Sequence, residues 1–177
     1  MAGVKIIFNM KAYIEAELNV LGLLFDMTRR LIDASSQIVL TQTLAEDTQH
    51  LIMLLERDAA PAASLSESIA AQSVRGLRPP KDVLELLALG LVAKERAHAK
   101  YAGGAASAGE AQERRLLTAL SDAEARHCSW LKRTLEQKAR ERGVREVSRL
   151  FRRCRQDSDQ AVSNVAVKNK ERIQTNR

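Results

Sequence analysis

Residues 44–57 read LAEDTQHLIMLLER, and this stretch decides the expected fold. Its apolar residues recur at the spacing of an α-helix, and the stripe that they form comprises Leu40, Leu44, Leu51 and Leu54. Asp47 lies in the centre of this stripe, and His50 follows it by three residues. Residues three apart are neighbours on a helix surface, so this carboxylate and this imidazole can reach one metal ion.

The same acid-x-x-His spacing occurs twice more, in Glu95-Arg-Ala-His98 and in Glu124-Ala-Arg-His127. Glu95 and Glu124 each fall among the apolar positions of a further helical segment. Near the N-terminus, Glu17 lies on the apolar face of another segment, whereas Glu15 points about 100° away. Each long helix is therefore expected to turn one acid toward the core.

Several ionised carboxylates in an apolar core need a counter-charge, because each unpaired one costs several kcal/mol. Two divalent cations would supply that charge. The predicted cofactor is two iron ions, with manganese possible because both metals use these ligands. The predicted metal ligands are Glu17, Asp47, His50, Glu95, Glu124 and His127. His98 is not required by this pattern and is expected beside the site or exposed to solvent.

Composition supports an all-α fold. Hydrophobic residues make up 45% of the 177-residue chain and aromatic residues 3%, which argues against a β-sandwich or barrel. Periodicity predicts four long helices, at residues 10–34, 37–57, 82–102 and 110–141. We expect a ferritin-like four-helix bundle with one long crossover between the second and third helices.

The connections follow from glycine and proline. Residues 58–81 hold all three prolines and a possible capping box, Ser64 with Glu67, for a short helix. The sequence AGGAASAG at 102–109 is expected to be a loop, and Gly143 to end the fourth helix. A short fifth helix, with an apolar face of Val144, Val147, Phe151 and Cys154, should follow and fray after about Asp157. These boundaries give two units, a bundle at 1–142 and a basic C-terminal segment at 143–177.

The positive charge is concentrated in that C-terminal segment. Residues 138–177 carry 12 basic and 5 acidic side chains, whereas residues 1–137 carry 16 basic and 17 acidic ones. Such asymmetry favours an acidic partner such as nucleic acid or a membrane surface, and a solvated helix is the alternative. The predicted nucleic-acid contacts are Arg145, Arg149, Arg152, Arg153 and Arg155.

No apolar run approaches the roughly 20 residues that span a membrane, and the N-terminus lacks a secretory signal pattern. The two cysteines, Cys128 and Cys154, form neither a CxxC metal motif nor a disulfide framework. A cytoplasmic location is therefore expected.

Residues 10–155 resemble the ferritin-like di-iron superfamily. The stretches LAEDTQHLIMLLER and LSDAEARHCSWLKRTLE resemble the second and fourth helix signatures of rubrerythrin-type proteins. A closer likeness is to the bacterial tRNA hydroxylases that oxidise the isopentenyl group of a hypermodified adenosine beside the anticodon. That family has Ser-Glu-Ala-Arg-His where this chain has residues 123–127, and Gly90, Arg96 and Tyr101 fit its third helix.

The resemblance implies an oxygen-activating di-iron hydroxylase that binds tRNA and receives electrons from an external donor. An ungapped match, however, puts Lys94 where the family has its third-helix metal-binding Glu, and a shift of one residue is needed to put Glu95 there. The apolar face favours Glu95. If Lys94 faces the site instead, its ammonium would replace a cation and the chain would be a metal-free relative. Whether the chain is an enzyme therefore stays open.

Two other functions remain open on the sequence. The same ligands could serve a rubrerythrin-like protein that reduces peroxide or handles iron, although its electrons must come from elsewhere because rubredoxin-type cysteines are lacking. The chain could also be a metal-free helical bundle that acts as an interaction module.

Overall fold

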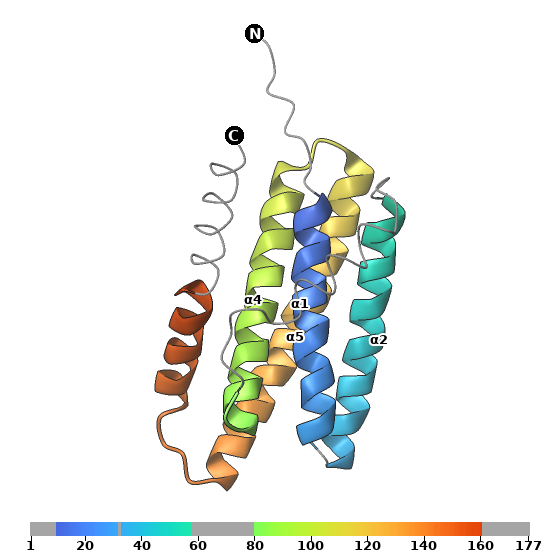
Figure 1. Cartoon of the computed structure of the whole chain (residues 1–177). Helices are drawn as coiled ribbons and strands as arrows, with labels where there is room; N and C mark the ends of the chain where they lie inside the picture. The colour runs from blue at the N-terminus through green and yellow to red at the C-terminus, as the bar shows by residue number, and fades with distance from the viewer. Residues whose placement is uncertain (1–9, 32, 58–79, 161–177) are drawn as a thin grey trace, which may run out of the picture.

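The computed structural model describes residues 10–31, 33–57 and 80–160, and this part of the chain contains helices and no strand. Four long helices lie side by side as a bundle, α1 (Met10–Arg30), α2 (Ala34–Arg57), α4 (Val83–Ser107) and α5 (Ala111–Glu141) (Figure 1). Residues 147–160 form a further helix. The predicted all-α class is thus confirmed. No helix in the described ranges is long and apolar enough to cross a membrane.

The first hairpin turns earlier than the sequence periodicity suggests. Helix α1 ends at Arg30 rather than at residue 34, and α2 begins at Ala34 rather than at residue 37. The reason is Asp33, whose Oδ1 accepts hydrogen bonds from the Ser36 amide and the Ser35 hydroxyl, each at 2.9 Å. A side-chain oxygen that satisfies free amides in this way fixes the start of a helix.

Helix α4 continues through most of the segment expected to be a loop. It is capped at its start by Asp82 Oδ1, which accepts from the Leu84 and Glu85 amides, and it runs to Ser107. The prediction of a loop at 102–109 is therefore wrong for residues 102–107. Gly104 serves close packing instead, because a Cβ there would lie 2.2 Å from Tyr13 Oη and 3.0 Å from Leu117 Cδ1.

The end of α5 has the hydrogen bonds of a Schellman motif. Gly143 adopts a φ of 67°, the Val144 amide donates to the Ala139 carbonyl, and the Gly143 amide donates to the Arg140 carbonyl. The expected stop at Gly143 is therefore confirmed. Val144 precedes the next helix and is exposed, so it does not belong to that helix's apolar face.

Helix 147–160 lies along the outer side of α4 (Figure 1). Cys154 joins the apolar core, and Val147, Leu150 and Phe151 pack against it. The helix continues past Asp157, where fraying is expected from the sequence, because Ser158 and Asp159 accept hydrogen bonds from Arg96 of α4. The rest of the expected frayed tail, 161–177, and the expected short helix at Ser64 lie outside the described residues.

Helix α4 is the most enclosed element of the described chain. Fifteen of its 25 residues are buried, which agrees with its nearly uniform apolar sequence. Two apolar clusters fill the bundle, one containing Leu24, Leu87 and Leu131 and the other containing Tyr13, Tyr101 and Leu117. Along each long helix the residues between these two clusters include buried charged side chains, so the polar site lies in mid-bundle.

Candidate metal centre

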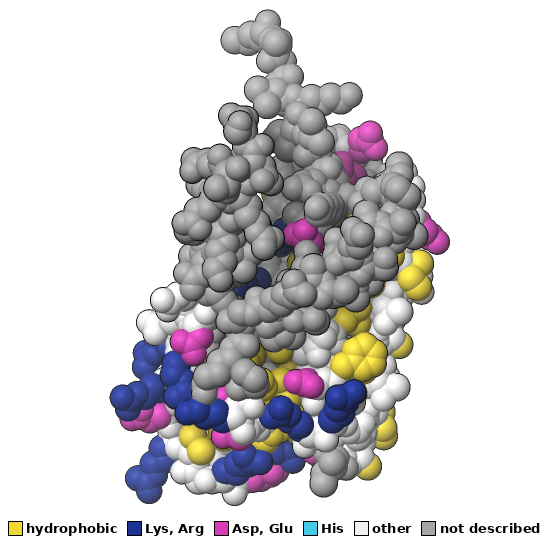
Figure 2. Space-filling view, viewed as in Figure 1, with side chains coloured by type: hydrophobic (Ala, Val, Ile, Leu, Met, Phe, Trp, Pro, Cys, Tyr) yellow, Lys and Arg dark blue, Asp and Glu magenta, His cyan; other side chains and the backbone are white. Residues whose placement is uncertain are grey.

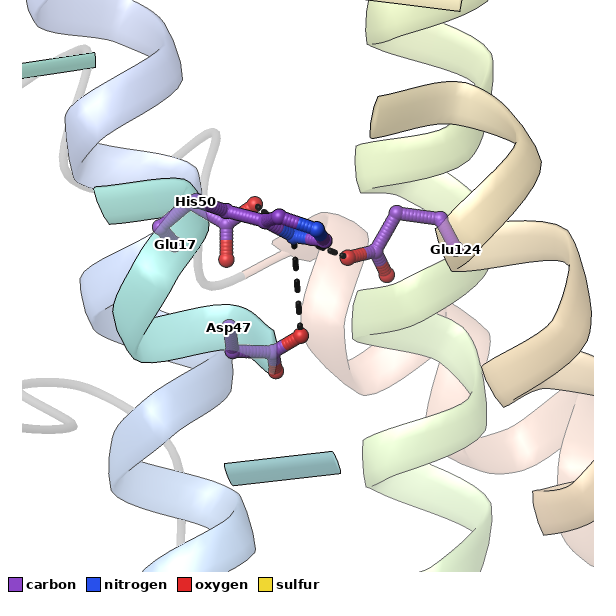
Figure 3. A group of neighbouring side chains, drawn as sticks. All are labelled: Glu17, Asp47, His50 and Glu124. Atoms are coloured by element: carbon purple, nitrogen blue, oxygen red, sulfur yellow. Dashed lines mark ion pairs between the residues drawn. The ribbon is translucent and has the colours of Figure 1, made fainter. Parts of the chain in front are cut away.

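Four buried side chains from three helices converge in mid-bundle (Figure 3). Glu17 comes from α1, Asp47 and His50 from α2, and Glu124 from α5, and one ligand atom of each lies within 4.8 Å of all the others. The His50 ring points into the middle of the group. Its Nδ1 lies 3.7 Å from Glu17 Oε1, 3.9 Å from Asp47 Oδ1 and 3.8 Å from Glu124 Oε1.

The three acids reach the interior because each one occupies the apolar stripe of its helix. When the stripe packs against the neighbouring helices, the carboxylate is buried with it. Glu17, Asp47 and Glu124 are accordingly completely shielded from solvent. The expectation that these three carboxylates meet in mid-bundle is confirmed.

Helix α4 contributes a lysine to this site instead of an acid. Lys94 is fully buried, and its Nζ lies 2.6 Å from both carboxylate oxygens of Asp47 and 2.9 Å from Glu124 Oε1. The expectation that Glu95 turns inward is wrong, since the Glu95 carboxylate pairs with Arg155 on helix 147–160. Consecutive helical residues point about 100° apart, so α4 can present only one of these two residues to the site.

The second predicted histidine ligand, His127, lies beside the lysine. Its Nδ1 is 3.3 Å from Asp47 Oδ1 and 3.9 Å from Glu124 Oε1, and its Nε2 is 3.0 Å from Glu46 Oε2. Both ring nitrogens thus face carboxylates, and because Glu46 is the closer one we assign the proton of neutral His127 to Nε2, so that the Nδ1 lone pair faces the site. The sequence analysis did not single out Glu46, although it is an acidic residue directly before Asp47.

Tyr101 contacts a carboxylate of the site, whereas His98 contacts Ser121 of α5. The Tyr101 hydroxyl donates to Glu17 Oε1, and its ring stacks on Tyr13 with 5.4 Å between centroids. The sequence analysis did not single out Tyr13 either, although it lies one helical turn before Glu17 and therefore on the same side of the helix. His98 is half-buried, and its Nδ1 lies 2.9 Å from the Ser121 hydroxyl and 3.0 Å from the Ser121 carbonyl, so this histidine serves the contact between α4 and α5.

The charges in the site shift one another's pKa values. Burial raises the pKa of Glu124 to about 7, although the nearby Lys94 ammonium opposes that change. Burial would also raise the pKa of Asp47, but His127 and Lys94 outweigh it and lower that pKa. For Lys94 and His50, burial disfavours the charged form, and the surrounding carboxylates outweigh burial and raise both pKa values. The site therefore stabilises the positively charged forms of Lys94 and His50.

Several polar atoms of this site make no hydrogen bond. They are Glu17 Oε2, Glu124 Oε2, His50 Nδ1 and His127 Nδ1, all in buried residues. Such atoms cost about 1–3 kcal/mol each when they are left unpaired, and coordination of a metal ion is one way to satisfy them. Metal coordination needs deprotonated ligands, and in that state three carboxylates and the Lys94 ammonium carry a net charge of −2, which one divalent cation balances. A buried Glu-Asp-His-Glu group of this kind could hold a metal ion.

The five arginines predicted to contact nucleic acid divide into two groups. Arg153 and Arg155 reach back to Glu85 and Glu95 of α4, so they help to dock helix 147–160. Arg145 and Arg152 are exposed, and Arg149 pairs with Glu146 at 3.3 Å. A pocket of about 500 Å³ lies on this side, and the described residues that line it are Glu146, Arg149, Leu150, Arg152, Arg153 and Gln156. Figure 2 shows Lys and Arg side chains gathered there, at the lower left of the molecule.

Comparison with known proteins adds no assignment. No family model, no curated protein and no solved structure matches this chain. What it does therefore has to be argued from the geometry described above.

Proposed function

We propose that this chain is a metal-binding helical bundle that holds iron or manganese with Glu17, Asp47, His50 and Glu124. The observation that carries the proposal is the convergence of four buried ligand atoms within 4.8 Å of one another, in a site with unpaired buried polar atoms. A ligand set of carboxylates and imidazole suits both metals.

Within this class, the chain is best described as a diverged relative of the di-iron hydroxylases. The four packed helices and the long separation of α2 from α4, residues 58–82, support a ferritin-like arrangement with one long crossover. Lys94 faces the site, the case in which the sequence implied a metal-free relative, and its ammonium beside Asp47 and Glu124 argues against an unchanged dinuclear centre. The unpaired buried atoms of Glu17, Glu124 and His50 favour one retained metal ion over a metal-free site.

Bound iron would supply one-electron redox chemistry toward oxygen, as in the proteins that the chain resembles. The residues of the chain would orient the ligands and keep water away. Tyr101 holds Glu17 through its hydroxyl, and the apolar clusters on either side of the site exclude solvent. Glu124, whose pKa is raised to about 7 in the metal-free site, would release its proton when it coordinates the metal ion.

Metal analysis tests the proposal. Protein purified without chelator should contain iron or manganese, and protein stripped with EDTA should rise in melting temperature when Fe(II) or Mn(II) is added, because ligand binding stabilises the folded state. Glu17→Gln should weaken binding at least tenfold. Glu15→Gln, two residues away on the same helix, is the matched control and should not. A chain that neither contains nor responds to these metals would refute the proposal.

A second candidate function is binding of RNA, and the arginine-lined pocket on helix 147–160 favours it. Guanidinium groups match the geometry of phosphate oxygens, and the apolar side of this helix is already used against α4. Deleting the helix would uncover the core, so substitution is the better test.

The double substitution Arg149→Gln with Arg152→Gln should remove two phosphate contacts. The loss of tRNA affinity between 50 and 200 mM salt should then be about tenfold smaller than in the wild type. Arg115→Gln with Arg133→Gln, two exposed arginines of α5, is the control of equal charge. An unchanged salt dependence in the helix 147–160 variant would rule this interface out.

A further inference from the structure

Lys94 pairs with two of the three carboxylates of the candidate metal centre. Its Nζ is held by both oxygens of Asp47 and by Glu124 Oε1. Nδ1 of His50 lies within 3.9 Å of all three carboxylates, those of Glu17, Asp47 and Glu124. Asp47 and Glu124 thus lie near both the Lys94 ammonium and His50 Nδ1, and Glu17 lies near His50 Nδ1.

The geometry points to Lys94 as a built-in cation that limits this centre to one metal ion. The inference rests on the proposed metal-binding function and adds the number of ions and the residue that sets it. Three carboxylates balance one ammonium and one divalent ion. A second divalent ion would leave a surplus of positive charge in a buried site, which is strongly unfavourable.

The donors for a second ion are present around the Lys94 ammonium. Asp47 and Glu124 already bind Nζ, and His127 Nδ1 lies 3.3 Å from Asp47 Oδ1 without a hydrogen bond of its own. Glu46 accepts from Nε2 of His127, which leaves the Nδ1 lone pair toward the carboxylates. The lysine therefore occupies a position that a divalent ion could take with three protein ligands.

Replacing the lysine by an acid should convert the centre from one ion to two. Lys94→Glu removes the ammonium and supplies a fourth carboxylate, so two divalent ions would balance the charge. The control is Lys132→Glu, which makes the same change of charge at an exposed position of α5.

The experiment uses the full chain, stripped of metal and titrated with Mn(II) alone. The wild type and Lys132→Glu should bind one equivalent and give the six-line electron paramagnetic resonance signal of an isolated Mn(II). Lys94→Glu should bind two equivalents and lose much of that signal through coupling between adjacent ions. Circular dichroism checks that each variant retains its helices, and if Lys94→Glu does not fold, Lys94→Gln should bind the second ion more weakly.

Each other outcome refutes a defined part of the argument. A wild type that binds two ions would show that the lysine is displaced by metal, and a folded Lys94→Glu that binds only one would show that it does not set the number. Either result overturns the role given to Lys94 and leaves the proposed metal binding intact. A wild type that binds no Mn(II) and no Fe(II) overturns the proposed function itself.

Discussion

Removing the Lys94 ammonium from the metal-free protein should cost a large part of its stability. The side chain is fully buried and makes contacts of 2.6, 2.6 and 2.9 Å with Asp47 and Glu124. Lys94→Met keeps most of the apolar stem but leaves these carboxylates without their cation. Breaking a buried ion pair in this way costs about 3–5 kcal/mol. For a chain of this size, each kcal/mol corresponds to roughly 2–4 °C in melting temperature.

The effect should depend on pH in a defined direction. In the folded wild type the pKa of Glu124 is raised to about 7, so the folded state binds a proton between about pH 4.5 and 7 that the unfolded state releases. The contribution of Glu124 to stability therefore falls as pH rises through this window. Without the ammonium, the pKa of Glu124 should rise further, so the loss of stability in Lys94→Met should be smaller at pH 5 than at pH 7.5.

Urea unfolding followed by circular dichroism, with EDTA present, measures both effects. Lys132→Met is the control, because an exposed substitution on α5 should change stability by no more than about 0.5 kcal/mol. A loss of less than about 1 kcal/mol for Lys94→Met at pH 7.5, or an equal loss at both pH values, would refute the reasoning about the buried ion pair.

Three further predictions concern the site and the helix that carries Lys94. Mn(II) affinity should rise about tenfold per pH unit up to about pH 7, because binding displaces the proton of Glu124. The rise should be steeper at pH values where His50, whose pKa is also raised, must lose a proton as well, and a pH-independent titration would contradict this. Gly103→Ala should raise stability by about 0.5–1 kcal/mol in urea unfolding, because the residue lies in α4 with open space around its Cβ; a loss would contradict a helix there. Glu95→Gln should leave Mn(II) affinity within about twofold of the wild type, because Glu95 pairs with Arg155; a tenfold loss would return Glu95 to the ligands.

The sequence alone predicts that the helices form and that the acids on three of them turn toward the core. In α1, α2 and α5 apolar and polar positions alternate with the helical period, so one face is marked for burial and the acid on that face must follow it inward. Periodicity therefore predicts the inward direction of Glu17, Asp47 and Glu124 correctly. Helix ends are less well determined, because they depend on local contacts such as the Asp33 cap and the packing of Gly104 against Tyr13.

Only the tertiary structure decides which residue α4 presents to the site. Its sequence is apolar on nearly every side, so periodicity marks no single buried face, and the apolar neighbours that favoured Glu95 indicated the wrong residue. Helix 147–160 packs on the outer side of α4 and supplies Arg155 to Glu95, while Asp47 and Glu124 on the inner side attract the ammonium. Because electrostatic partners from three other helices fix the rotation of α4, this choice can be read only from the packed bundle.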